Sequence, residues 1–101
     1  MIQSSEKQSL LEDVQYLFEE IENGIDDLKG FRSRFHHLWP ANFELEPSLR
    51  RVARLRGQMG DEVEPEQLRQ FVKMLEVEKD MIVQKISELW DAERKDRLKY
   101  R

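Results

Sequence analysis

The two histidines of the chain are the first residues to consider for metal or acid–base chemistry. His36 and His37 are adjacent, so on a helix their side chains point about 100° apart and cannot both ligate one metal ion. Di-iron sites in helical bundles use a Glu-x-x-His pair, but Ser33 and Arg34 occupy the positions where the glutamate would stand. We therefore expect histidines on the surface or at a helix end.

Acidic side chains also gather in the first third of the chain, at Glu19, Glu20, Glu22, Asp26 and Asp27. Carboxylates along an exposed helix are usually solvated, and no histidine or cysteine accompanies these. The chain has no cysteine at all, which excludes disulfides, thiolate metal sites and cysteine nucleophiles. No serine–histidine–acid constellation and no glycine-rich phosphate loop can be assembled. The sequence predicts a protein that is not an enzyme and needs no cofactor or metal.

Four arginines form the strongest candidate for contact with anions. They are Arg50, Arg51, Arg54 and Arg56. Such a cluster could bind phosphates of a nucleic acid, with help from a basic C-terminal tail. The net charge of the whole chain is −4, however, and acidic and basic blocks alternate along it. Blocks of opposite sign can face each other in an antiparallel helical fold. The cluster therefore has two interpretations: it contacts a partner, or it pairs with acidic residues of the same chain.

Helices must position these residues, and the first helix has the clearest pattern. Its apolar residues fall at steps of three and four: Leu11, Val14, Phe18, Ile21, Ile25 and Leu28. Their mean step of about 3.5 residues is typical of helices that supercoil around a partner. We predict a helix over residues 5–38, with a capping-box spacing at Ser5. Gly24 leaves open whether this helix is continuous. After Leu28 the spacing of the apolar residues shifts, which predicts a bend or a new packing neighbour near Gly30.

Prolines divide the rest of the chain. Pro40 cannot continue a helix, whereas Pro47 and Pro65 suit the first turn of one. The predicted elements are a connection over residues 39–46, a short helix over 47–58, a loop over 59–64, a long helix over 65–96 and a basic tail over 97–101.

The long last helix carries apolar residues on two sides. Its main face holds Leu68, Phe71, Val72, Leu75, Ile82, Val83, Ile86, Leu89 and Trp90. Met74, Val77 and Met81 lie on the other side and predict a second neighbour. Two long helices and one short helix do not easily surround such a helix, so we expect a homodimer that shares it. Alternatively, the three residues complete the core within one chain.

Lys79 is the one cation on the main apolar face of this helix. Its amine is expected to reach the rim of the core while its stem packs. If it is buried instead, it needs an acid from the first helix as its partner.

Length and composition fit a single all-α domain over residues 1–101. Charged residues make up 38% of the chain and the mean hydropathy is −0.78, but the apolar residues are large and periodic, which favours a folded protein. No segment shows the alternation of a strand, and no apolar run is long enough to cross a membrane. We expect a small cytoplasmic adaptor, assembly factor or chaperone-like protein that binds an unidentified protein, or itself, through coiled-coil-like helix packing.

Overall fold

The computed structural model describes residues 2–60 and 63–99, and every regular element among them is helical. The elements are α1 (Ile2–Arg34), a 3-10 turn η1 (His36–Leu38), α2 (Glu46–Gln58) and α3 (Pro65–Lys99). The predicted all-α fold of two long helices and one short helix is confirmed. The molecule is elongated, with extents of 62 × 21 × 16 Å. No helix in the described ranges combines the length and apolarity needed to cross a membrane.

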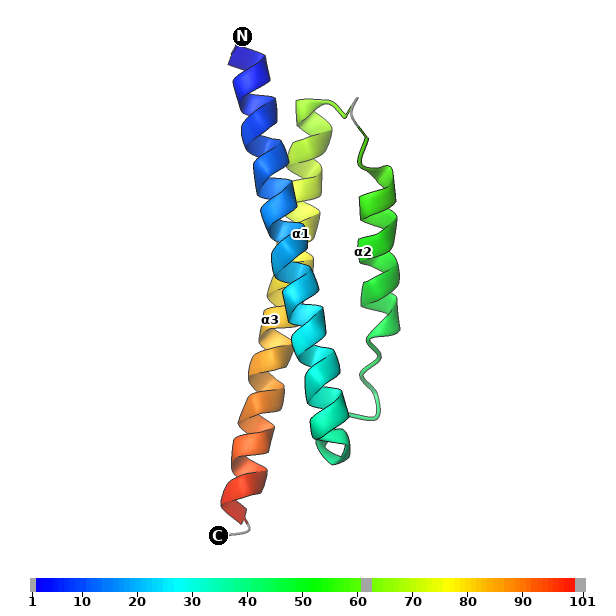
Figure 1. Ribbon diagram of the computed structural model, residues 1–101, viewed down its shortest axis with the longest axis vertical. Helices are drawn as coiled ribbons and strands as arrows, with labels where there is room; N and C mark the ends of the chain where they lie inside the picture. The colour runs from blue at the N-terminus through cyan, green and yellow to red at the C-terminus, as the bar shows by residue number, and fades with distance from the viewer. Residues whose placement is uncertain (1, 61–62, 100–101) are drawn as a thin grey trace.

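The two long helices run in the same direction, and α2 runs against both (Figure 1). Glu6 near the start of α1 forms an ion pair with Arg69 near the start of α3. Near the other ends of these helices, the ring of Phe31 packs edge-on against Trp90. Helix α1 contains eight acidic and four basic residues, whereas α3 contains eight of each, so parallel pairing places an acidic helix beside a helix with no net charge. The basic α2 therefore lies beside one acidic helix and one helix of balanced charge.

The core lies mainly between α1 and α3, and Val52 and Leu55 of α2 are buried against it. The predicted seam of α1 is buried at Val14, Phe18, Ile21, Ile25 and Leu28, and Leu11 is partly buried. From α3 the fully or nearly fully buried apolar residues are Leu68, Leu75, Ile82 and Leu89. These residues of α3 recur every seven positions, which keeps one line of side chains facing a parallel partner helix along its length. Each such side chain contributes roughly 1.5–3 kcal/mol through burial.

Helix α1 continues unbroken through both of its glycines. Gly24 is buried at a point where α1 closely approaches Ile82: a Cβ built on this glycine would lie 2.6 Å from Ile82 Cγ2. Gly30 has nothing within 4 Å of the same position. The first glycine therefore permits close helix packing, whereas the second has no packing role.

The boundaries of the long helices differ from the sequence prediction. Helix α1 begins at Ile2, before Ser5, because serine is tolerated inside a helix. It ends at Arg34, and the chain tightens into η1, whose C-cap Trp39 is extended as expected before a proline. At the other end of the chain α3 reaches Lys99. The predicted loop and tail also include residues 61–62 and 100–101, which lie outside the described residues.

The connection between η1 and α2 covers one end of the core. Leu45 is completely buried, and the indole Nε1 of Trp39 donates a hydrogen bond to the carbonyl oxygen of Phe43 at 3.1 Å. The ring centres of Trp39 and Phe43 lie 5.1 Å apart. Pro47 occupies the first turn of α2, as predicted. These contacts fix where α2 begins its return along α1 and α3.

Two residues assigned to the main face of α3 are more exposed than predicted. Val83 is 54% exposed, so its assignment to the core face is wrong: it lies at the margin of the apolar arc, where no described helix covers it. Trp90 is 43% exposed, although one side of its ring packs against Phe31 and Phe35.

Candidate interaction surface

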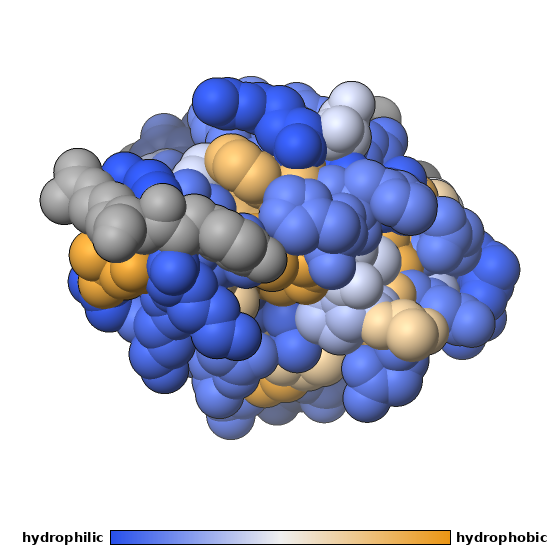
Figure 2. Space-filling model, turned by 90° about the horizontal axis from the view of Figure 1, so that it is seen from below, coloured by the Kyte–Doolittle hydropathy of each residue, from blue (hydrophilic) through white to orange (hydrophobic). Residues whose placement is uncertain are grey.

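The outer side of α3 carries the apolar residues that the sequence assigned to a partner. Met74, Val77 and Met81 are 50%, 59% and 52% exposed. They follow one another at steps of three and four, so they share one stripe of the helix surface. We call these three residues the docking face. By contrast, the end-on view of the molecule in Figure 2 shows a mostly hydrophilic surface with small apolar patches.

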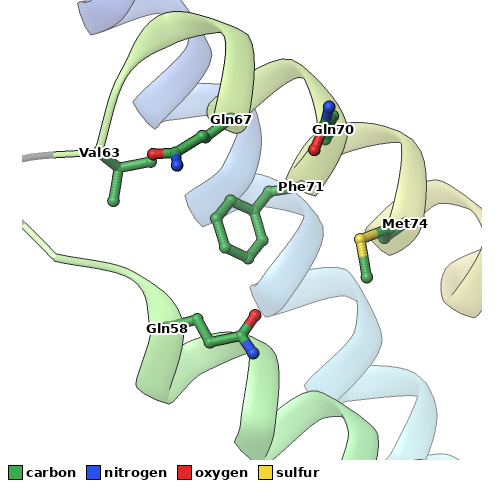
Figure 3. Close-up of a pocket in the computed structure, with 6 residues that line it drawn as sticks. All are labelled: Gln58, Val63, Gln67, Gln70, Phe71 and Met74. Carbon is green, nitrogen blue, oxygen red and sulfur yellow. The ribbon is translucent and has the colours of Figure 1, made fainter.

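A groove between α2 and the start of α3 adjoins the docking face. It has a volume of about 300 Å³, and its lining is formed by Gln58, Val63, Gln67, Gln70, Phe71 and Met74. In Figure 3 the ring of Phe71 projects from α3 toward α2, with glutamine side chains around it. A lining of one aromatic ring, small apolar groups and amides offers no charged group to a substrate. It suits an apolar side chain of a partner, with amides available for hydrogen bonds at the rim.

A second groove lies further along the same two helices. It has a volume of about 280 Å³ and is lined by Arg51, Arg54, Leu55, Gln58, Met74 and Glu78. Met74 therefore borders both grooves. Methionine is flexible and polarisable, which lets it adapt to different neighbours. The two grooves and the docking face form one continuous region on α3 and α2.

The four candidate arginines of α2 have two different environments. The guanidinium of Arg51 forms an ion pair with Glu78 and donates a hydrogen bond to the hydroxyl of Ser48 at 3.1 Å. Arg56 forms an ion pair with Glu22 of α1, and its guanidinium lies 4.6 Å from the centre of the Phe18 ring.

The other two arginines of the cluster have no such partner. Arg50 and Arg54 are exposed and form no ion pair within the part of the chain that the structure describes. Half of the arginine cluster thus pairs α2 with carboxylates of α1 and α3.

Glu78 is a site residue that the sequence reasoning missed. Only 7% of it is exposed, on the side of α3 that faces α2. One carboxylate oxygen accepts a hydrogen bond from Arg51, and the other, Oε2, is buried without a partner among the described residues. A signal was present: Glu78 lies three residues after Leu75 and four before Ile82, within the apolar arc of the helix.

Lys79 reaches the rim of the core, as one of its two interpretations predicted. It is partly buried, and its ammonium lies 5.5 Å from the centre of the Tyr16 ring of α1. A cation over an aromatic face is stabilised by roughly 0.5–1 kcal/mol at an exposed site. No acid of α1 pairs with Lys79 in the described structure; the buried carboxylate of this region belongs to the preceding residue, Glu78.

The histidines and carboxylates do not combine into a chemical site. His36 and His37 are exposed in η1, and Nε2 of His37 lies 3.4 Å from Asp96 Oδ2. Of the acidic cluster on α1, Glu22 pairs with Arg56. Within residues 2–60 and 63–99 no three acidic or histidine side chains are arranged to hold a metal ion.

Among the described residues, Glu46, Glu88 and Asp91 have lowered pKa values, and each lies at a helix end or in an exposed ion pair. The pKa of Glu46 is lowered chiefly by its own backbone N–H at the start of α2, and then by Arg32. Hydrogen bonding to Lys85 lowers the pKa of Glu88, and hydrogen bonding to Lys95 lowers the pKa of Asp91. These carboxylates stay charged at neutral pH, and their shifts follow from helix-surface pairs.

No protein-family model, curated protein sequence or solved structure matches this chain. Its own residues therefore carry the case for its function.

Proposed function

We propose that this chain is a non-enzymatic protein–protein interaction module that binds a helical partner through the docking face of α3. The supporting observation is the half-exposure of Met74, Val77 and Met81 on one side of a helix whose opposite side forms the core. Burying a side chain of this kind completely is worth roughly 1.5–3 kcal/mol. Covering the exposed halves of all three contributes roughly 2–4 kcal/mol toward binding, part of which offsets the entropy lost on association.

The grooves beside the docking face support a helix as the partner. A helix lying along α3 presents side chains at steps of three and four, in register with the docking face. Its neighbouring side chains then meet the apolar and amide lining of the two grooves that Met74 borders. An adaptor or assembly factor in the cytoplasm is the kind of protein that these features suit.

Anion binding by α2 receives less support. Arg51 and Arg56 already pair with carboxylates of the same chain, so a phosphate would have to compete with both pairs. Only Arg50 and Arg54 are available to a nucleic acid from the original cluster, within the described structure. Retention on heparin near physiological salt, lost on charge reversal of these two, is the result that would favour this alternative.

Site-specific photo-crosslinking tests the proposed function. A photoreactive phenylalanine analogue replaces Val77 in the docking face, and the same analogue replaces Val83 as a matched control. The control is the same residue type on the same helix, 54% exposed against 59% for Val77, but six positions along and on a different flank. In cells that express the chain, we expect a discrete adduct from position 77 and none from position 83.

The substitution Met81→Glu should abolish that adduct, because a charge replaces the apolar group beside Val77. Equal adducts from positions 77 and 83, or no adduct from position 77, would show that the docking face does not bind a partner. Circular dichroism of each variant confirms that the helices remain formed.

A further inference from the structure

The outward stripe of α3 around Val77 is nearly the same when it is read in either direction. On the outward side of α3, steps of four and three from Gln70 lead to Met74, Val77, Met81 and Gln84. The stripe is symmetric about Val77, with methionines three or four positions away on each side and a glutamine seven positions away on each side. Such a stripe is suited to contact a second copy of itself across a two-fold axis, because a two-fold interface brings the same patch from both copies together.

The charges beside this stripe are related by the same symmetry, but a cation on one side of Val77 corresponds to an anion on the other. Lys73 precedes Val77 by four positions, and Asp80 follows it by three. If two α3 helices cross antiparallel at Val77, the pair Lys73 and Met74 of one copy faces the pair Asp80 and Met81 of the other. Each dimer then contains two Lys–Asp pairs, and methionine meets methionine on either side of the axis.

Both charged residues are available for such a contact. Lys73 and Asp80 are exposed, and neither has an ion-pair partner within the described chain. Elsewhere on α3, Glu78 pairs with Arg51, and Lys85 pairs with Glu88 at 3.0 Å. Lys73 and Asp80 thus lie beside the docking face, at the spacing that the two-fold arrangement requires.

The complementary stretch is limited to residues 70–84. Beyond it, Glu66 of one copy would face Glu88 of the other, and like charges oppose contact. The stretch is about 21 Å long at 1.5 Å per residue. An interface with three apolar residues per copy at its centre is small, so the association it gives is weak and concentration-dependent.

We propose that the partner of the docking face is a second copy of this chain, bound antiparallel through α3 with its two-fold axis at Val77. This inference rests on the proposed function, since it names the partner of the same surface. The symmetric apolar stripe supplies the attraction, and the Lys73–Asp80 pairs select the antiparallel register over a parallel one, in which identical charges would meet.

Charge reversal tests the register. In Lys73→Glu, both ion pairs of the dimer become contacts between two acids, and in Asp80→Lys both become contacts between two lysines. Because two attractive pairs become repulsive at once, we expect either variant alone to weaken the dimer Kd about tenfold at low salt, which corresponds to about 1.4 kcal/mol. Sedimentation equilibrium across a dilution series measures the Kd, and the double variant Lys73→Glu with Asp80→Lys should recover the original value.

An equimolar mixture of the two single variants gives the sharpest result. In the mixed dimer, the copy with Lys73→Glu presents acids at positions 73 and 80, and the copy with Asp80→Lys presents lysines at both positions. Every facing pair of the mixed dimer is therefore attractive. We expect the mixture to dimerise like the unaltered chain although each component alone does so about tenfold more weakly. Both residues are exposed and lack an ion-pair partner in the described structure, so folding is unaffected, as an unchanged urea midpoint for each variant verifies.

Two results overturn the inference. The first is an unaltered chain that remains a 12.2 kDa monomer up to about 1 mM, the concentration that corresponds to about 4 kcal/mol of association free energy. The second is a mixture that fails to recover the dimerisation that each single variant loses. The crosslinking experiment separates these failures from failure of the proposed function. An adduct of position 77 with a different protein, in a chain that stays monomeric, retains the interaction module and removes the self-partner.

Discussion

Substituting alanine at the two helical glycines of α1 should change stability in opposite directions. Both Gly24 and Gly30 lie inside the helix, where alanine is favoured over glycine by about 1 kcal/mol. At Gly30 a new methyl group meets nothing within 4 Å. Gly30→Ala should therefore raise the free energy of unfolding by roughly 0.5–1 kcal/mol, as the usual cost of glycine in a helix indicates.

At Gly24 the same methyl group would lie 2.6 Å from Ile82 Cγ2, which is far inside van der Waals contact. The isoleucine cannot easily move away, because it is 4% exposed and its branched Cβ restricts its rotamers. Overpacking of this kind costs about 1–3 kcal/mol. After the gain in helix propensity, Gly24→Ala should lower the free energy of unfolding by about 1 kcal/mol.

Thermal and urea denaturation, each followed by circular dichroism, measure both effects. For a chain of this size, 1 kcal/mol corresponds to a Tm shift of roughly 4–8 °C, so the two variants should differ by about twice that. Ile82→Ala supplies the internal check: it creates space, so adding Gly24→Ala to it should no longer destabilise. Equal stabilisation by alanine at both glycines would refute the close approach of α1 and α3 at this point.

Three further predictions concern charged residues. Arg51→Met should destabilise the chain by about 2 kcal/mol, since it leaves the buried Glu78 carboxylate without its one partner in the described structure; adding Glu78→Met should restore most of that loss in the same urea assay. Lys79→Met should cost no more than about 1 kcal/mol, because the described contact of the ammonium is an aromatic one, and a larger loss would contradict its position at the rim. Lys95→Ala should return the pKa of Asp91 toward its usual value, as carboxyl NMR titration can measure. The folded-state pKa of Asp91 is depressed, so its contribution to stability is present at neutral pH and lost as the pH falls through that pKa; the variant should lack this part of the acid sensitivity.

Much of the fold could be predicted from the sequence because its signals are local. The three-and-four spacing from Val14 to Leu28 identified the buried side of α1, and Pro47 marked the start of α2. The direction of α3 relative to α1 could not be predicted in this way, because hydrophobic periodicity is the same for parallel and antiparallel neighbours. It depends on how the connections before and after α2 carry the chain back.

The candidate site was predictable only in part. A helical-wheel projection of α3 alone places Met74, Val77 and Met81 on the side opposite the core. The roles of Arg51 and Glu78 do not follow from such a projection, because their pairing joins positions 27 residues apart on different helices. A run of arginines is equally typical of a nucleic-acid surface and of a helix that pairs with carboxylates of its neighbours. Only the packing of α2 distinguishes the arginines engaged within the chain from those available outside it.

The docking face is a consequence of unequal helix lengths and of the position of α2. At 1.5 Å per residue, the 35 residues of α3 extend over about 52 Å and the 13 of α2 over about 20 Å. Helix α1 covers one side of α3, and α2 can cover a second side for less than half its length. Because Met74 borders the groove that Arg51 and Glu78 also line, the ion pair that holds α2 in place also shapes one margin of the docking face. Loss of that pair should therefore weaken partner binding along with the fold, whereas substitutions of Lys73 and Asp80 should affect binding alone.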